Sequence, residues 1–149
     1  MSQMPVLRLL LRIRRRGPIN TYAVAFMLTE SHFRGAAFRI GELVFAVLAL
    51  SVGFKKPRVT LGKCQVGLRY WQELFGFRRT ELIRAVLDDV CNYDVCCYYL
   101  QKVSCENLRE AAIHYNGKPS QLYVKLLQEN LAAVASLVSR MNCAVAMRI

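Results

Sequence analysis

The segment Asn20–His32, NTYAVAFMLTESH, is the stretch that decides the fold class of this chain. Asn20 or Thr21 is suited to cap a helix, because both side chains accept hydrogen bonds from the free backbone amides at a helix start. Behind this cap, four residues recur at helical spacing: Tyr22, Ala25, Phe26 and Thr29. We therefore expect a helix that runs to about His32 and carries Glu30 in its last turn.

Further helices are predicted on the C-terminal side of this segment. Phe38 to about Val52 is apolar nearly all round, which predicts a buried helix. A long last helix is expected from about Ser120 to Arg140. Shorter helices are expected between them, over residues 68–75, 80–87, 93–103 and 107–115. The least helical stretch, Gly53–Cys64, predicts a turn with a short strand or hairpin.

The composition agrees with a single helical domain. The chain has 149 residues, which is enough for one core, and 54% of them are apolar. Four prolines and eight glycines leave few breaks among the helix formers. We predict an all-α class with at most a small hairpin. The predicted boundaries are a basic N-terminal arm over residues 1–19, irregular up to residue 17, and one domain over 20–149.

Positive charge dominates the chain, with a formal net charge of +11. Residues 1–60 carry ten Lys/Arg against two acidic residues, a balance of +8, and residues 61–149 carry eleven against eight, a balance of +3. Such a surface suits an anionic polymer: nucleic acid, anionic lipid or peptidoglycan. No nucleic-acid motif matches, so nucleic acid is not the expected partner.

The N-terminus does not have the pattern of a secretory signal. Arg8 and Arg12 interrupt the apolar run that begins at Val6, and further arginines follow that run instead of preceding it. The run Leu43–Leu50 is too short to span a bilayer, so no transmembrane segment is expected. A basic amphipathic start describes the N-terminus better.

The six cysteines do not predict a metal site. None forms a Cys-x-x-Cys pair, and the chain has two histidines, so tetrahedral zinc spacing is absent. Two interpretations stay open, namely buried thiols that pack as small hydrophobic groups, or a disulfide in an oxidising compartment. Neither a metal nor a cofactor is expected.

Three separated segments carry the residues suited to chemistry: 28–34 (LTESHFR), 60–66 (TLGKCQV) and 111–117 (AAIHYNG). Each is common by itself. A carboxylate at a helix end is usually solvated, a Gly-x-x-Gln is a frequent turn, and a Tyr-Asn-Gly is a frequent helix stop. Their order and spacing together are more specific.

Together these segments resemble the soluble lytic transglycosylase family, glycoside hydrolase family 23, whose fold is related to goose-type lysozyme. In that family a Glu-Ser pair ends a helix, a Gly-x-x-Gln segment follows across a turn, and a Tyr-Asn pair ends a later helix. The resemblance covers roughly residues 21–127 and implies a lysozyme-like helical domain. This chain departs from the family in an apolar insertion over 34–58, and in Gly62-Lys63-Cys64-Gln65 where Gly-Leu-Met-Gln is usual.

The resemblance implies that Glu30 is the catalytic acid and base. It implies substrate-binding roles for Ser31, Gly62, Gln65, Tyr115, Asn116 and Tyr123. The residue chemistry is compatible with these roles, because an amide both donates and accepts hydrogen bonds to sugars and a glycine lets the backbone approach a ligand. Apolar neighbours in sequence are expected to raise the pKa of Glu30. Tyr70 and Trp71 are open to two roles, stacking on sugar rings or packing in the core.

The implied reaction cleaves the MurNAc-GlcNAc β-1,4 bond of peptidoglycan glycan strands and leaves a 1,6-anhydroMurNAc end. The three segments hold no second carboxylate beside Glu30, which favours this reaction over hydrolysis. Asp88, Asp89 and Asp94 are expected to be surface or capping groups. Two alternatives stay open: a hydrolytic muramidase on the same fold, as an antibacterial effector or phage lysin, and a non-enzymatic basic module that binds nucleic acid or membrane.

The expected place of action is the periplasm or cell envelope. Without a clear signal peptide, the chain is expected to reach it by a non-standard route or by host or phage delivery. A secretion system or phage lysis machinery is then the expected further partner.

Overall fold

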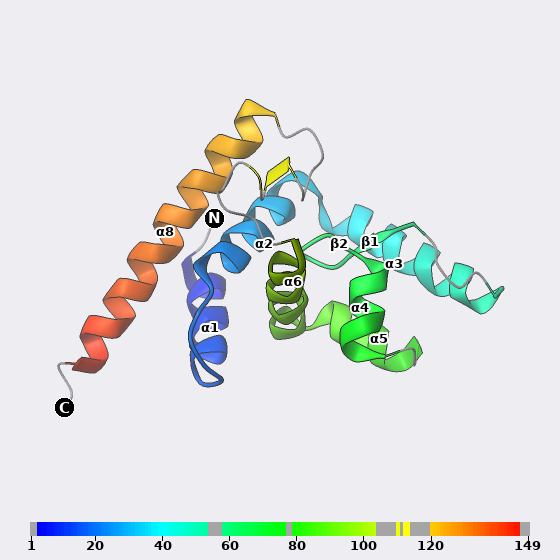
Figure 1. Cartoon of the computed structure of the whole chain (residues 1–149), viewed down its shortest axis with the longest axis horizontal. Helices are drawn as coiled ribbons and strands as arrows, with labels where there is room; N and C mark the ends of the chain where they lie inside the picture. The colour runs from blue at the N-terminus through cyan, green and yellow to red at the C-terminus, as the bar shows by residue number, and fades with distance from the viewer. Residues whose placement is uncertain are drawn as a thin grey trace.

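The computed structural model describes residues 3–53, 58–76, 79–103, 110, 112–113 and 120–146. Within these ranges the chain is almost entirely helical, with one two-stranded sheet (Figure 1). The predicted all-α class is therefore confirmed. The elements in chain order are α1 (Gln3–Arg14), α2 (Thr21–Phe33), α3 (Ala36–Ser51), β1 (Thr60–Leu61), β2 (Val66–Gly67), α4 (Leu68–Phe75), α5 (Arg79–Leu87), α6 (Asp89–Val103) and α8 (Gln121–Ala146).

Helix α2 lies at the centre of the molecule, between α6 and the long helix α8 (Figure 1). Its start confirms the predicted cap, because the Asn20 side chain accepts a hydrogen bond from the Ala23 amide at 3.2 Å. Seven of its thirteen residues are buried. The Asn130 side chain of α8 donates to the Thr29 hydroxyl at 3.0 Å, which fixes α8 along the C-terminal half of α2.

The irregular conformation predicted for residues 1–17 is wrong, because Gln3–Arg14 forms the regular helix α1. Its buried side chains follow one helical stripe and join the common core: Val6, Leu9, Leu10 and Ile13. The arginines that interrupt the apolar run in the sequence lie on the other side of this helix. Arg12 pairs with Asp88 at 2.8 Å, and Arg16, just beyond the helix, pairs with Asp94 of α6 at 2.9 Å.

Helix α3 forms where it is predicted, but the prediction that it is buried is wrong. Only Ala46 and Ala49 of α3 are buried. Figure 1 shows that α3 leads away from the other helices, on the side of the molecule opposite to α8. The strand β1 is its main packing partner. Because β1 has two residues and α3 has sixteen, β1 covers only one face of the helix.

The predicted hairpin is present, with Thr60 opposite Gly67 and Leu61 opposite Val66 in antiparallel pairing. Its turn requires a glycine at position 62, which has a φ of +77°. A Cβ atom there would lie 2.1 Å from Oδ1 of Asn92 and 2.8 Å from Trp71. Asn92 is fully buried, and its side chain accepts from the Lys63 amide at 2.6 Å. The hairpin is thereby fixed on α6.

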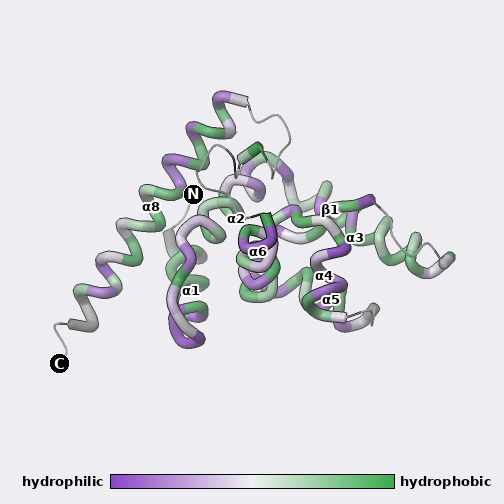
Figure 2. The backbone as a smooth tube through the Cα atoms, viewed as in Figure 1, coloured by the Kyte–Doolittle hydropathy of each residue, from purple (hydrophilic) through white to green (hydrophobic). Residues whose placement is uncertain are grey.

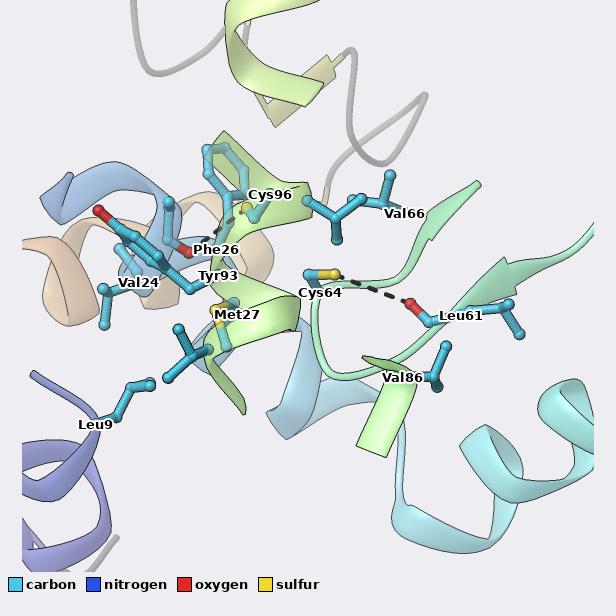
Figure 3. Packing of buried hydrophobic residues seen from close by; sticks show 14 of the residues in the cluster. Leu9, Val24, Phe26, Met27, Leu61, Cys64, Val66, Val86, Tyr93 and Cys96 are labelled. Carbon is cyan, nitrogen blue, oxygen red and sulfur yellow. Dashed lines mark hydrogen bonds between the residues drawn. The ribbon is translucent and has the colours of Figure 1, made fainter. Parts of the chain in front are cut away.

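The core joins these elements into one body. Figure 3 shows side chains of α1 and α2 on one side and those of the hairpin and α5 on the other, with α6, which carries Tyr93 and Cys96, between them. Cys64 and Cys96 pack in this core. Trp71 is also fully buried, and its indole donates to the carbonyl of Val66 at 3.2 Å, so it takes the core role of the two left open by the sequence. No helix within the described ranges combines the length and apolar content that crossing a bilayer requires.

Candidate functional site around Glu30

The carboxyl group of Glu30 is buried at the C-terminal end of α2, where the side chain is only 5% exposed. The hydroxyl of Tyr123, from the first turn of α8, donates to its Oε1 atom at 2.6 Å. Burial raises the pKa of Glu30, while the Tyr123 hydrogen bond and the charge of Arg34 lower it and the charge of Glu42 raises it. The net result is a pKa raised above the ordinary value of a glutamate, the direction that the sequence predicts.

Such a carboxyl group is suited to proton transfer. A raised pKa keeps it protonated closer to neutral pH, where it can donate that proton and later take one back. Burial, and then the charge of Glu30, raise the pKa of Tyr123 well above its usual range, so this phenol stays a hydrogen-bond donor. The ring of Phe33 stacks on that of Tyr123, with centroids 5.4 Å apart, and holds the phenol in place.

Beside Glu30, a polar cluster connects α2, α3 and the hairpin. Its centre is the guanidinium of Arg34, whose Nη1 lies 2.7 Å from Oε1 of Gln65 and 3.3 Å from Oε1 of Glu42. The hydroxyl of Thr60 lies 2.9 Å from each of these two oxygens. Since that hydroxyl carries one proton, it donates to one of the two at a time. Arg34, Glu42, Thr60 and Gln65 are called the Arg34 cluster below.

The side chain of Gln65 lies in the Arg34 cluster, and both ends of its amide are engaged there. Its Oε1 accepts from Arg34, and its Nε2 donates to the Gly62 carbonyl at 3.0 Å. Gln65 is buried and has a φ of +52°, a left-handed backbone conformation in the hairpin turn. In the described structure Gln65 therefore orients other groups of the site.

The other predicted site residues have different outcomes. Tyr123 contacts Glu30 directly. The close neighbours of Gly62 are Asn92 and Trp71, so the predicted close approach of its backbone to a ligand is not what requires this glycine. Ser31 is half-buried, and its hydroxyl lies 3.5 Å from the Lys63 carbonyl, which joins the end of α2 to the hairpin turn. Tyr115 and Asn116 lie outside the described residues.

Sequence reasoning missed Glu42 and Arg34. Glu42 is the lone acidic residue between positions 34 and 58, which is the signal that was available. Its side chain is 15% exposed, and within the described part of the chain its buried Oε2 atom has no hydrogen-bond partner. Arg34 follows Glu30 by four residues and is the C-cap of α2, where its backbone amide donates to the Glu30 carbonyl at 3.0 Å.

The three aspartates behave as the sequence predicts. Asp88 caps α6 by accepting from the amides of Val90 at 2.8 Å and Cys91 at 3.0 Å. Asp89 pairs with Lys63 at 2.6 Å and Asp94 with Arg16 at 2.9 Å. Among the described residues, Glu42 is the acidic residue whose charge acts on Glu30.

A cavity of about 800 Å³ adjoins the Arg34 cluster, a size typical of ligand sites. Glu42 and Thr60 line it on the cluster side, and Phe45, Arg58 and Arg69 line it further out. The cavity thus has carboxylate, hydroxyl and guanidinium groups around an apolar interior. This combination can bind a polar, ring-shaped molecule such as a sugar.

Comparisons of the chain with protein-family models, with curated proteins and with solved structures find no match. The resemblance to soluble lytic transglycosylases therefore stays a prediction that depends on the sequence order of Glu30-Ser31, Gly62-x-x-Gln65 and Tyr115-Asn116.

Proposed function

We propose that this protein is a peptidoglycan lytic transglycosylase that acts in the cell envelope. One observation carries the proposal: the buried carboxyl of Glu30, with its raised pKa, lies against Tyr123 and next to the cluster that holds Gln65. Glu30 and Gln65 are two of the residues that carry the resemblance to the family, and Tyr123 is one of the substrate-binding residues that the resemblance implies.

In the proposed reaction, protonated Glu30 gives its proton to the oxygen of the MurNAc-GlcNAc β-1,4 bond. The bond between that oxygen and C1 breaks, and the electron pair leaves with the oxygen. The N-acetyl oxygen of the substrate stabilises the positive charge that develops at C1. The ionised Glu30 then takes the proton of the muramyl 6-hydroxyl, whose oxygen bonds to C1 and closes the 1,6-anhydro ring without water.

The neighbours of Glu30 fit the two halves of this cycle. A protein interior that raises its pKa favours the acid form needed first. The Tyr123 hydroxyl and the Arg34 charge favour the ionised form that exists between the two proton transfers. In this proposal the glycan strand lies in the cavity beside the Arg34 cluster. Glu42 and Thr60 line that cavity but Glu30 does not, so the proposal requires the scissile bond to reach past the cluster to the buried carboxyl.

The position of Glu42 supports a second candidate function, that of a hydrolytic muramidase. Its charge acts on Glu30, and its Oε2 faces no hydrogen-bond partner among the described residues, so a water molecule there could be activated by it. Both reactions release soluble fragments from the wall, but the products differ by one water per cleaved bond. The end group of the product decides between them.

The test is digestion of purified sacculi with the full chain, followed by mass spectrometry of the fragments. We expect 1,6-anhydroMurNAc ends, and reducing ends would favour the muramidase instead. Glu30→Gln should lower the rate of release about 10²–10⁴-fold, since that is the usual contribution of a general acid and base. The matched control is Glu129→Gln, at an exposed glutamate of α8.

A folded Glu30→Gln protein with full activity would exclude Glu30 as the catalytic group. If the wild-type chain releases nothing from sacculi, the non-enzymatic alternative gains, namely a basic module for nucleic acid or membrane. That alternative predicts binding that falls steeply with salt and does not depend on Glu30.

A further inference from the structure

Helix α3 exposes an unusual amount of apolar surface. Six large apolar side chains of α3 and its C-cap are each between 51% and 76% exposed: Phe38, Ile40, Val44, Phe45, Leu48 and Val52. Figure 2 shows α3 as a largely apolar segment that projects from the rest of the chain. Exposed apolar residues are ordinary when scattered, but a row of them on one element marks a surface that meets an apolar partner.

The polarity of α3 is inverted relative to an ordinary surface helix. Its charged side chains, Arg39 and Glu42, are half-buried on the side that carries the buried Ala46 and Ala49. The opposite side carries the apolar row, and its one hydroxyl is that of Ser51. A helix that only covered a core would have the reverse pattern.

Cationic side chains border this apolar face, called the α3 face below. The guanidinium of Arg34 lies over the ring of Phe38, 5.2 Å from its centroid. Arg58 and Arg69 are exposed and line the same cavity as Phe45. The single acidic residue of α3, Glu42, also lines this cavity, but it is paired with Arg34 at 3.3 Å, so the charge that Arg58 and Arg69 bring to the border is positive. The partner of the α3 face must therefore be apolar at its centre and negatively charged at its edge.

We propose that the α3 face docks the protein on an anionic lipid bilayer, with α3 lying in the plane of the membrane. A bilayer offers acyl chains to the apolar row and headgroup phosphates to the arginines at the same time. The sixteen residues of α3 make a helix of about 24 Å. A helix that spans a bilayer needs roughly 20 residues, or about 30 Å, so α3 is too short to cross it. A second copy is a poorer occupant, because each chain brings a net charge of +11 and the two repel.

The experiment is flotation of the purified full chain with vesicles of phosphatidylcholine containing phosphatidylglycerol, and with vesicles of phosphatidylcholine alone. We expect the wild type to bind the anionic vesicles at least about tenfold more tightly than the neutral ones. The test variant is Ile40→Ser/Leu48→Ser, which makes the centre of the α3 face polar without adding charge. It should bind the anionic vesicles at least about tenfold more weakly than the wild type.

The matched control is Leu87→Ser/Leu122→Ser, because these leucines are as exposed as Ile40 and Leu48 but lie on α5 and α8. The control should bind like the wild type, and so should Glu30→Gln, since docking does not depend on the proposed enzyme activity. Circular dichroism verifies that each variant is folded, and Val44→Ser replaces the double variant if that one is not.

Three results would overturn the proposal. The first is a wild type that does not float with anionic vesicles. The second is a folded α3 variant that binds as well as the control. The third is a wild type that forms a dimer in solution, loses it in the Ile40→Ser/Leu48→Ser variant and ignores vesicles, which would assign the α3 face to a second copy of the chain.

Discussion

At the scale of single residues, the Glu30–Tyr123 pair combines two opposing influences on one carboxyl group. Burial favours the protonated form, while the hydrogen bond that Tyr123 donates favours the ionised form. A group with both influences can exchange a proton in either direction near its working pH. Removing one of the two influences should therefore shift the pKa of Glu30 in a predictable direction.

Tyr123→Phe is expected to raise the pKa of Glu30 further, because the hydrogen bond that lowers it is lost. The alkaline limb of the activity profile, where the general acid loses its proton, should then move to higher pH. The measurement is the rate of fragment release from sacculi as a function of pH. Tyr93→Phe is the control, since Tyr93 is bound to the start of α2 by the Asn20 amide at 2.8 Å. A limb that stays in place or moves to lower pH would contradict the role given to the Tyr123 hydroxyl.

Glu30→Gln is expected to stabilise the protein at neutral pH. Because the folded chain raises the pKa of Glu30, the contribution of this group to stability is complete below its unfolded pKa and is lost as the pH rises through the folded value. Glutamine cannot ionise, so the variant should melt a few degrees above the wild type near pH 7.5 and at the same temperature near pH 4. Differential scanning calorimetry at the two pH values measures this, with Glu129→Gln as the control. An equal melting temperature near pH 7.5 would show that ionised Glu30 carries no penalty.

The candidate residues of the site were predictable where they occur in short ordered segments. Glu30 and Gln65 follow from the spacing of their segments, and the structure brings Gln65 to the cluster beside Glu30 through Arg34. Glu42 was not predictable in the same way, because it belongs to an insertion whose position depends on tertiary packing. Its isolation among apolar residues was a signal, but a helix interpreted as buried gave it no place near Glu30.

At the scale of elements, local sequence determined most helices. The Asn20 cap and the apolar spacing behind it give α2, and the predicted helix over residues 68–75 coincides with α4. Helix α6 begins at Asp89, four residues before its predicted start, because Asp88 caps it with two amide bonds. The prediction of an irregular arm at α1 is wrong for a physical reason. In the linear sequence the arginines interrupt the run of leucines, but in a helix of about 3.6 residues per turn they lie on a different side from the leucines.

Gly62→Ala is expected to destabilise the protein by about 2–5 kcal/mol. An alanine at position 62 is strained in the left-handed backbone conformation that Gly62 adopts. Its Cβ would also lie 2.1 Å from Asn92, which overpacks the junction of the hairpin with α6. Urea unfolding followed by circular dichroism gives the free energy. The control is Gly41→Ala in α3, where a Cβ meets nothing within 4 Å. This control should be more stable by about 0.5–1 kcal/mol, because alanine is the better helix former.

A Gly62→Ala protein as stable as the wild type would mean that the hairpin does not depend on its close contact with α6. The Gly41→Ala result then shows whether the assay detects a change of the expected size.

At the scale of the whole molecule, α1 belongs to the same core as the catalytic candidates. Leu10→Ala should therefore lower the free energy of unfolding by about 2–5 kcal/mol, because Leu10 is fully buried. Leu11→Ala is the neighbouring control, since Leu11 is 46% exposed, and it should cost under about 1 kcal/mol. Urea unfolding of both variants measures the difference. Equal values would mean that the first helix is a dispensable arm after all.

The arrangement of helices in space was the part that sequence could not supply. The apolar composition of α3 predicts that the helix is buried. This prediction fails because the sequence alone does not say how many other elements pack against a helix. The structure gives α3 one covered side and leaves the other exposed. The side that is covered holds Glu42 against Arg34, so the placement of α3 decides both the site and the exposed face.

Arg34 is shared by three parts of the molecule, and that sharing couples them. One guanidinium nitrogen serves the glutamine of the turn, the glutamate of α3 and the threonine of the first strand. An incoming hydroxyl group that takes over one of these acceptors changes the balance of attraction on the remaining two. We therefore expect a sugar bound in the neighbouring cavity to shift α3 through Glu42, which a spectroscopic label on that helix would detect.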